Sequence, residues 1–398
     1  MRAILIKGSS AYDALGMFID AFAQAFAAAG HEPIVIDASA GRGPDFYPDL
    51  ERHAARGPIG LVFTFNVLGD VRDPAGRFIG DIVAAPHVVQ FVDYPPSHLD
   101  RLEAMSPNAV LLTVDCSHVE TILSTYGPDR FAHVGFSPHA AVGATVSPGP
   151  DPAGFAAARP IPILFPGTFQ EPDASRWAHM PDGVQRIYEA AVEIALAAAW
   201  MPALAALDEA MIALGLDPAD KNFAEFRKTT TFVHEYVRAH RRLQVLNTAR
   251  ALGIPLHVVG KGYDGRLDAY PNLTFGGEVD FAAGLDLMAR SRVVLNVNAN
   301  FGAGSHERPL CGMNAGAAAA SDVSAFYAAN FKVGEEIVLY RWRDLEAGLA
   351  AVAELAKDAE AAFAMAQAGQ RRVVAEHRWI NRVETVIAAA EAARRARS

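Results

Sequence analysis

The sequence predicts an α/β protein with two domains, each built on a parallel sheet. Short apolar segments alternate with longer segments in which apolar residues recur at helical spacing, a pattern typical of βαβ units. Hydrophobic residues make up 51% of the chain and charged residues 20%, which is the composition of a globular protein rather than a disordered one. At 398 residues the chain is too long to fold around one ordinary hydrophobic core, so we expect two domains of about 150 to 200 residues each.

The first domain is expected over residues 1–150. Residues 3–8 have the pattern of a buried strand that ends in a glycine–serine turn, and apolar residues then recur at helical spacing up to Gly30. Further apolar strands are expected at residues 31–37, 60–65, 87–92 and 110–114. Because helical segments separate them, these strands should form a parallel sheet with both faces covered.

The second domain is expected over residues 151–375. Its boundary lies within a segment rich in proline, glycine and alanine, residues 143–162, whose composition suits an interdomain connection, and a hinge is expected near residues 143–160. Its strands are expected at residues 161–165, 256–260, 273–275, 293–297 and 317–321. About residues 183–252 have the Ala, Leu and Glu content of several helices, which indicates a helical insertion. Residues 376–398 should form a final helix.

The charge balance and the cysteines exclude several classes of partner and site. The chain has 35 Lys and Arg against 45 Asp and Glu, a net charge of -10, which is the wrong sign for binding phosphate backbones, so no nucleic-acid partner is expected. Cys116 and Cys311 lie in no zinc or disulfide pattern, so no metal site is expected and a reducing cytoplasm fits best. Neither a signal peptide nor a transmembrane segment is recognisable.

Ligands of open parallel sheets bind beyond the carboxyl ends of the strands, so the turns there are the first places to search. After strand 161–165, Gly167 lets backbone approach a ligand and Thr168 offers a hydroxyl. After strand 256–260, Lys261 lies between two glycines and suits a phosphate charge. The alternative for Lys261 is a bare turn with a solvated side chain.

The turn after strand 293–297 carries the strongest signal. A glycine-rich loop runs through Gly304 and Ser305 into a helix, whose N–H groups and dipole favour a pyrophosphate, and His306 and Arg308 would add charge-assisted donors. The alternative is that Ser305 only caps the helix while Arg308 is solvated. The sequence has no P-loop motif, no GxGxxG after its first strand and no Asp-x-Asp pair for a Mg²⁺-clamped nucleotide.

Three C-terminal segments read HERPLCGMNAGAAAASD, FKVGEEIVLYRWRDLEAGL and AGQRRVVAEHRWINRV. They resemble GT-B glycosyltransferases, especially the CgeB-like group (spore maturation protein-like) within the family 1-4-like glycosyltransferases. Upstream, LFPGTF, IPLHVVGKGYDG and NLTFGGEVDF follow that group's order, and VFTFNVLGD, VVQFVDYPPSHL, LLTVDCSHVE and FSPHA resemble its N-terminal domain. The resemblance covers most of the chain outside the helical insertion.

This resemblance implies two Rossmann-like domains facing a cleft, with the last helix crossing back to the first domain. It also implies a metal-independent transferase of the hexosyltransferase type, without cofactor, that moves a sugar from a nucleotide-diphosphate sugar to a hydroxyl of a sugar, lipid or protein acceptor. Cationic side chains and a helix N-terminus would stabilise the departing diphosphate. The implied donor-binding residues are Gly167, Thr168, Lys261, Gly262, Glu278, Val279, Gly304, Ser305, His306, Glu307 and Arg308. Backbone near Glu278 and Val279 would hold the base of the nucleotide.

The chain departs from the family where the donor ribose would bind. Many retaining GT-B enzymes carry a pair of glutamates at positions that match Ala303 and Cys311 here. Glu307 or Glu336 is a hypothetical substitute. The stereochemical course stays open, because an inverting transfer needs a general base whereas a retaining transfer can use the leaving phosphate.

The candidate catalytic bases lie in the first domain. Asp93 ends a predicted strand before a Tyr-Pro-Pro turn and is the first choice, and His118 and His139 occupy comparable turns. The alternatives are that Asp93 caps backbone N–H groups, that His118 only begins a helix and that His139 is a packed linker residue. Tyr12 and Asp13, near the first turn, are further candidates for contact with the acceptor.

Four basic residues of the insertion recur at spacings of three and four, which places several of them on one helix face. They are His234, Arg238, Arg241 and Arg242. Either this is a solvated or salt-bridged face, or it lines the donor site.

Two other functions remain open from sequence. One is a nucleotide-sugar epimerase of the same fold, which would need no acceptor. The other is a non-catalytic module that binds a nucleotide-sugar or a partner, an alternative favoured by the missing glutamate pair. Acceptor-dependent release of a nucleoside diphosphate separates these alternatives from a transferase. A homodimer is also left open.

Overall fold

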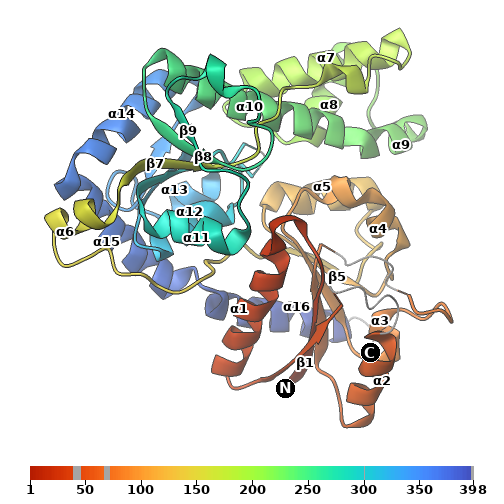
Figure 1. Ribbon diagram of the computed structural model, residues 1–398. Coiled ribbons are helices and arrows are strands. Elements are labelled where there is room, and N and C mark those ends of the chain that lie inside the picture. Colours follow the sequence, from red (N-terminus) through yellow and green to blue (C-terminus); the bar gives the residue numbers. More distant parts are fainter. Residues whose placement is uncertain (39–45, 67–71, 300, 396–398) are drawn as a thin grey trace. The chain divides into compact units, whose positions relative to one another are not determined.

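The computed structural model describes the chain except for residues 39–45, 67–71, 300 and 396–398 (Figure 1). It divides into two compact units, Met1–Val142 with Arg378–Ser398, and Gly143–His377. The sequence analysis places the corresponding boundaries after residues 150 and 375. Each unit has its own parallel sheet with flanking helices, which confirms the α/β class.

The first unit is built on a six-stranded parallel sheet of order β2-β1-β3-β4-β5-β6. The strands are β1 (Arg2–Lys7), β2 (Glu32–Asp37), β3 (Leu61–Phe65), β4 (His87–Phe91), β5 (Val110–Thr113) and β6 (His133–Phe136). The apolar runs predict all of them except β6, which is a short, half-buried edge strand that contains Gly135. The strand order reverses between β1 and β3, where this class of sheet places its ligand crevice.

In the described part of this unit, six α-helices cover the sheet or its ends. They are α1 (Ala14–Ala28), α2 (Tyr47–Ala55), α3 (Ile79–Ile82), α4 (Leu99–Ala104), α5 (Cys116–Tyr126) and α16 (Val383–Arg395). The last segment of the chain belongs to this unit, because the Trp379 ring packs 5.5 Å from Phe22 and 5.3 Å from Phe65 between centroids. The Arg394 side chain also donates to the backbone oxygen of Gly60 at 2.6 Å.

The second unit is built on another six-stranded parallel sheet, of order β12-β11-β10-β7-β8-β9. The strands are β7 (Ile161–Pro166), β8 (Leu256–Val259), β9 (Leu273–Phe275), β10 (Ser291–Leu295), β11 (Ala318–Asp322) and β12 (Val338–Tyr340). Only β12 is missed by the sequence analysis, since three residues at a sheet edge carry little periodicity. This is the doubly wound Rossmann order, whose switch point lies between β7 and β10.

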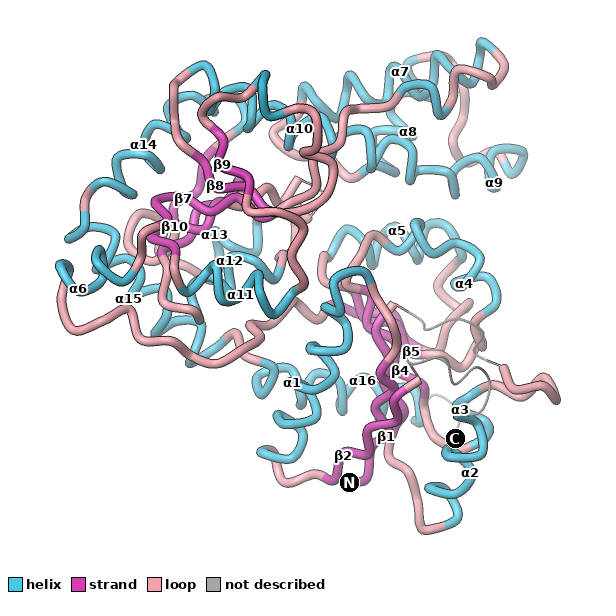
Figure 2. Tube along the Cα trace, in the orientation of Figure 1, coloured by secondary structure: helices cyan, strands magenta, loops and turns pink. Residues whose placement is uncertain are grey.

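The helices of the second unit include the predicted insertion. They are α6 (Pro152–Ala158), α7 (Asp182–Ala197), α8 (Ala203–Ala213), α9 (Ala224–Arg227), α10 (Thr231–Ala251), α11 (Phe281–Ala289), α12 (Glu307–Asn314), α13 (Ala325–Asn330), α14 (Leu345–Lys357) and α15 (Ala359–Glu376). Helices α7 and α8 lie side by side and extend away from the sheet, whereas α10 returns the chain to it (Figure 2). No helix in the described part of the chain combines the length and apolar character needed to cross a membrane.

The expectation that residues 143–162 form only a connection is wrong, because α6 lies inside this segment. Asp151 caps the helix, its carboxylate accepting from the Gly154 N–H at 2.7 Å, and Pro152 occupies the first turn. Proline is well tolerated there because the first N–H groups of a helix have no intrahelical partner.

Candidate functional site

The turns that follow β7 and β8 interlock at the carboxyl edge of the second sheet. The Phe169 N–H donates to the backbone oxygen of Lys261 at 2.8 Å. Gly260 has φ +130°, and a Cβ there would lie 2.6 Å from the backbone oxygen of Gly167. Gly262 has φ +85°, and a Cβ there would overlap the backbone oxygen of Phe169. Both glycines are therefore required for the two turns to approach.

The loop after β9 continues this row. The Gly260 N–H donates to the backbone oxygen of Gly277 at 3.1 Å, which places Glu278 and Val279 next to the turn after β8. The Glu278 side chain is exposed. The structure thus brings the predicted turns of β7, β8 and β9 together at one edge.

The glycine-rich loop after β10 is held by the end of β11. The Asn298 N–H donates to the carboxylate of Asp322, and the Asn296 side-chain amide donates to the Ser321 hydroxyl at 3.0 Å. Asp322 is buried, and burial raises the pKa of its carboxyl to about 6. These bonds fix the start of the loop beside the switch point.

The same loop ends at the N-terminus of α12. His306 is the N-cap residue, so the alternative that Ser305 caps this helix is wrong. The Tyr327 hydroxyl accepts from the His306 N–H and donates to its carbonyl oxygen, both at 2.9 Å. His306 Nδ1 lies 2.5 Å from a carboxylate oxygen of Glu307, and Arg308 Nε lies 4.0 Å from the other. Three predicted donor residues therefore form one charged group at the helix start.

Two arginines of α10 join Arg308 in what we call the arginine cluster, Arg238, Arg242 and Arg308. Burial lowers the pKa of Arg242 well below its ordinary value, and the positive charges of Arg308 and Arg238 lower it further. Arg242 Nε is buried and has no hydrogen-bond partner among the described residues. It lies 4.0 Å from the position that a Cβ on Gly167 would occupy. The cluster is therefore at the switch point of the sheet.

Tyr263, after β8, adds an uncharged donor to the cluster. Its side chain is 1% exposed, and its buried hydroxyl has no partner in the described part of the chain. Burial raises the pKa of this hydroxyl, while the charges of Arg242 and Arg308 act in the opposite direction. A buried hydroxyl and a buried guanidinium nitrogen without partners are costly, so this place is suited to an anion that accepts from both.

The four basic residues of helix α10 that were singled out from sequence have two different surroundings. Arg238 and Arg242, four residues apart, contribute to the arginine cluster, and the alternative that this face lines the donor site stays a prediction. Arg241 and His234 are buried instead of solvated, and Arg241 donates to the backbone oxygen of Leu196 at 2.7 Å. Tyr263 was not singled out from sequence, because a tyrosine after a turn has no periodic signal.

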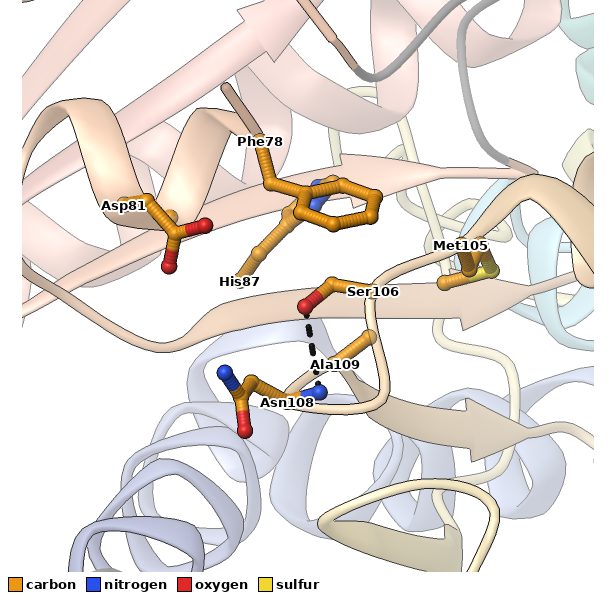
Figure 3. A pocket seen from close by; sticks show the side chains of 8 residues that line it. Phe78, Asp81, His87, Met105, Ser106, Asn108 and Ala109 are labelled. Carbon is orange, nitrogen blue, oxygen red and sulfur yellow. Dashed lines mark hydrogen bonds between the residues drawn. The ribbon is translucent and has the colours of Figure 1, made fainter. Parts of the chain in front are cut away.

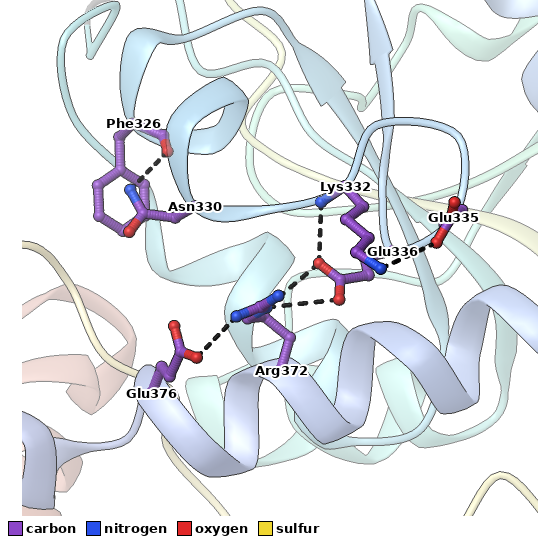
Figure 4. Close-up of polar contacts among 7 residues, drawn as sticks. All are labelled: Phe326, Asn330, Lys332, Glu335, Glu336, Arg372 and Glu376. Atoms are coloured by element: carbon purple, nitrogen blue, oxygen red, sulfur yellow. Dashed lines mark hydrogen bonds and ion pairs between the residues drawn. The ribbon is translucent and has the colours of Figure 1, made fainter.

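Glu336 does not lie at this edge. It precedes β12, so it is at the amino end of a parallel strand, opposite the arginine cluster. Its carboxylate accepts from the Lys332 N–H at 2.9 Å and pairs with Arg372 at 3.3 Å (Figure 4). The hypothesis that Glu336 replaces the missing ribose-binding glutamate is therefore wrong, and Glu307 is the remaining candidate.

Of the predicted bases in the first unit, Asp93 is accessible. It follows β4 at the carboxyl edge of the first sheet, and its carboxyl side chain is 62% exposed. The carboxylate accepts from the Asn66 side-chain amide at 2.7 Å and lies 3.5 Å from His98 Nε2. Asn66 itself has φ +50°, a left-handed conformation that asparagine adopts more readily than most other non-glycine residues.

His118 and His139 are buried in the first unit, with 1% and 2% exposure. The His118 ring packs against Tyr94, 5.1 Å between centroids. His139 packs against Phe18, and its backbone oxygen accepts from Arg382 at 3.0 Å. His118 lies in the first turn of α5, as its helix-start alternative expects, and the surroundings of His139 match its packed alternative; a catalytic role for either stays a prediction. Tyr12 and Asp13 lie after β1 with φ +63° and +56°, two consecutive left-handed residues.

A small pocket lies elsewhere in the first unit. Its lining includes Phe78, His87 and Met105, and His87 begins β4 (Figure 3). The pocket is thus at the amino ends of the strands, away from the edge where such sheets bind ligands. His87 Nε2 lies 3.0 Å from the Thr64 hydroxyl, and burial lowers the pKa of His87 to about 4. Within the described residues, no group of three or more His, Cys, Asp or Glu could hold a metal ion.

Comparisons with known proteins agree with this architecture. Residues 238–388, which include the whole arginine cluster, match a family model described as glycosyl transferase-like. An α-glucosyltransferase in complex with UDP is 10% identical with a TM-score of 0.57, over 98% of this chain and 100% of its own. The Anabaena protein HepE, in complex with UDP and glucose, is 10% identical with a TM-score of 0.51, over 98% and 100%.

Sucrose-phosphate synthase from Thermosynechococcus elongatus is 12% identical with a TM-score of 0.50, over 99% of this chain and 98% of its own. No curated protein matches the chain. At these identities the solved structures show the fold, which is that of GT-B glycosyltransferases. Assignment to the CgeB-like group stays a prediction.

Proposed function

We propose that this protein is a glycosyltransferase that moves a hexose from a nucleotide-diphosphate sugar to an acceptor hydroxyl without a metal ion. The observation that supports this most directly is the arginine cluster with Tyr263, at the switch point of the second sheet. Three like charges at a partly buried site repel one another, and a diphosphate would relieve that repulsion.

The same groups suit the chemistry of transfer. When the bond between the sugar and the diphosphate breaks, negative charge accumulates on the departing oxygen. Preorganised cations and donors stabilise that charge more strongly than water does, because they act at low dielectric and need no reorganisation. Arg242 Nε and the Tyr263 hydroxyl, buried without partners in the described chain, would each gain an acceptor.

The other predicted donor residues take complementary parts in this proposal. Thr168 and Lys261 would bind phosphate oxygens, and backbone near Val279 would hold the nucleotide base. Glu307 would accept a hydrogen bond from a ribose hydroxyl. The UDP complexes of HepE and of the α-glucosyltransferase support UDP as the first nucleotide to test. Cys116 and Cys311 are free thiols, which agrees with the proposed cytoplasmic location.

The acceptor side of the proposal rests on Asp93, whose exposed carboxylate at the carboxyl edge of the first sheet could take the acceptor proton. The acceptor itself is a sugar, lipid or protein hydroxyl. One observation favours the second candidate function, a non-catalytic binding module: Ala303 and Cys311 stand where many retaining relatives carry glutamates.

Thermal unfolding with UDP, GDP and ADP in the presence of EDTA tests the donor site. A nucleotide at a hundred times its dissociation constant should stabilise the protein by about 2.7 kcal/mol. Arg242→Met should remove this stabilisation. Arg250→Met, which removes an exposed arginine from the same helix, is the matched control and should retain it.

Turnover then separates the alternatives. Release of UDP that depends on an added acceptor supports the transferase, and conversion of UDP-hexose without acceptor identifies an epimerase. Binding without either reaction identifies a binding module. Absence of stabilisation by every nucleotide would overturn the donor site itself.

A further inference from the structure

Trp200, which follows helix α7 of the insertion, lies directly against the glycine-rich loop after β10. A Cβ built on Gly302 would overlap atoms of the Trp200 indole ring, so the ring contacts the Gly302 backbone with no room for a methyl group. Gly302 is buried although it lies in a loop. The insertion and the loop are therefore in van der Waals contact at this point.

The segment that carries Trp200 is itself fixed. Arg241 of α10 donates to the backbone oxygen of Leu196 at 2.7 Å and to that of Ala198 at 3.2 Å, at the end of α7. The Arg241 side chain is buried and lies 4.6 Å from the centroid of the Trp342 ring. Since its guanidinium is held on both sides, the single residue between Ala198 and Trp200 has little freedom.

The opposite side of the loop is fixed as well. The backbone oxygen of Gly302 accepts from the Ala325 N–H, the first residue of α13, at 2.7 Å. The Gly304 N–H donates to the backbone oxygen of Phe301 at 3.0 Å, which closes the turn that leads into α12. Gly302 is thus held between α13 and the indole ring, a few residues before His306 and Arg308.

We propose that Trp200 is a positioning residue for donor binding: the helical insertion uses it to fix the Gly302 turn and thereby the start of α12. This inference rests on the proposed function, because the ligand positioned is the diphosphate of the donor. It gives the insertion a role in the donor site that composition alone does not suggest. A displacement of about 1 Å in such a site can cost up to a hundredfold in rate.

The test compares UDP binding by calorimetry and steady-state kinetics across four variants. Trp200→Ala should weaken UDP binding roughly tenfold or more and raise the donor KM more than it lowers kcat. Trp200→Phe, which keeps an aromatic ring, should recover most of the affinity. Gly302→Ala should weaken binding because its methyl group would displace the indole ring, and the double variant Gly302→Ala/Trp200→Ala should bind better than Gly302→Ala alone.

Two controls make the outcome decisive. Ile212→Ala, an exposed position on the same insertion, should leave UDP binding unchanged. Backbone amide exchange of residues 301–306 should accelerate in Trp200→Ala and not in Ile212→Ala. If the wild type binds UDP and both Trp200→Ala and Gly302→Ala bind it with affinities within twofold of wild type, the inference is overturned while the proposed function stands. A wild-type protein that binds no nucleotide would overturn the proposed function and the inference with it.

Discussion

Arg242 Nε lies 4.0 Å from the place that a Cβ on Gly167 would occupy, and apart from the two chain neighbours no other described residue comes within 4 Å of that place. In the proposed donor site, this place between the Gly167 backbone and the guanidinium would face the ligand at the switch point of the second sheet. The predicted glycine and an arginine from a distant helix together define it, and a small change at Gly167 tests its use.

Gly167→Val should leave folding intact and block the ligand space. Among the described residues beyond the two chain neighbours, a Cβ there would meet only Arg242, at an ordinary contact distance, so the melting temperature should change little, whereas nucleotide affinity should fall at least tenfold. Gly260→Val is the contrasting variant. Its φ of +130° and the Gly167 oxygen 2.6 Å from its Cβ position predict a clear loss of stability. Equal nucleotide affinity of wild type and Gly167→Val, measured by calorimetry, would contradict this assignment.

Arg242→Met should stabilise the free protein while it removes nucleotide binding. The pKa of Arg242 is lowered by burial and by the neighbouring arginines, so its charge is disfavoured in the folded state at neutral pH. Methionine keeps much of the apolar stem without the charge. The melting temperature of the free variant should therefore rise, as is common when a functional charge is neutralised. A melting temperature below that of both wild type and the Arg250→Met control would show that Arg242 is structural.

Much of the fold and part of the site follow from sequence, for identifiable reasons. Buried parallel strands are apolar throughout, so runs of apolar residues predict them. The strands β6 and β12 are short, lie at sheet edges and pack on fewer neighbours, so no such run marks them. The turns after β7, β8 and β10 follow from the rule that ligands bind at carboxyl ends. The direction in which α10 presents Arg242 depends on tertiary packing, which helical spacing does not determine. The same holds for the contact between Trp200 and Gly302.

Asp322→Asn should change how stability depends on pH. Burial raises the pKa of Asp322 from 3.8 to about 6, so the folded state disfavours its ionised form. The protonated Asp322 carboxyl therefore contributes to the free energy of unfolding, and this contribution is fully present below the unfolded pKa and is lost as the pH rises through about 6. Ionisation of Asp322 lowers the free energy of unfolding by about 3 kcal/mol in total. Asparagine can still accept from the Asn298 N–H but does not ionise, so the variant should gain stability relative to wild type between pH 4 and pH 7.

Urea unfolding of both proteins at pH 4, 5, 6 and 7 measures this difference, and comparing the two cancels the other titrating groups. A stability difference that stays constant over this range would contradict the raised pKa of Asp322.

Gly316→Ala should destabilise the second unit. Gly316 has φ +75°, and a Cβ there would lie 2.5 Å from the backbone oxygen of Val146 and 2.6 Å from the Arg159 guanidinium. That guanidinium donates to the backbone oxygen of Ala315 at 3.0 Å and so holds the end of α12. We expect a loss of about 2 kcal/mol or more in urea unfolding.

Gly183→Ala is the matched control for Gly316→Ala. Gly183 lies in α7 with nothing within 4 Å of its Cβ position. Its replacement should be neutral or stabilise by about 0.4–1 kcal/mol. Similar losses for both variants would show that the second unit responds to any added methyl group, and not to the constraint at Gly316.

Asp93→Asn should lower kcat for transfer by about 10²–10⁴-fold and leave UDP affinity unchanged. The proposed donor residues all belong to the second unit, whereas Asp93 belongs to the first. Asparagine keeps an oxygen that can accept from Asn66 but cannot take a proton, so the loss should fall on the chemical step. Asp100→Asn, an exposed aspartate on nearby α4, is the matched control and should keep full activity.

The stereochemistry of the product decides what an unchanged rate would mean. Anomeric inversion, read from the NMR coupling of the new glycosidic bond, requires a base, and it should accompany the loss of rate in Asp93→Asn. Retention, together with a rate within threefold of wild type, would contradict the role of Asp93. The leaving phosphate would then be the acceptor of the proton, and the arginine cluster would hold it in place to do so.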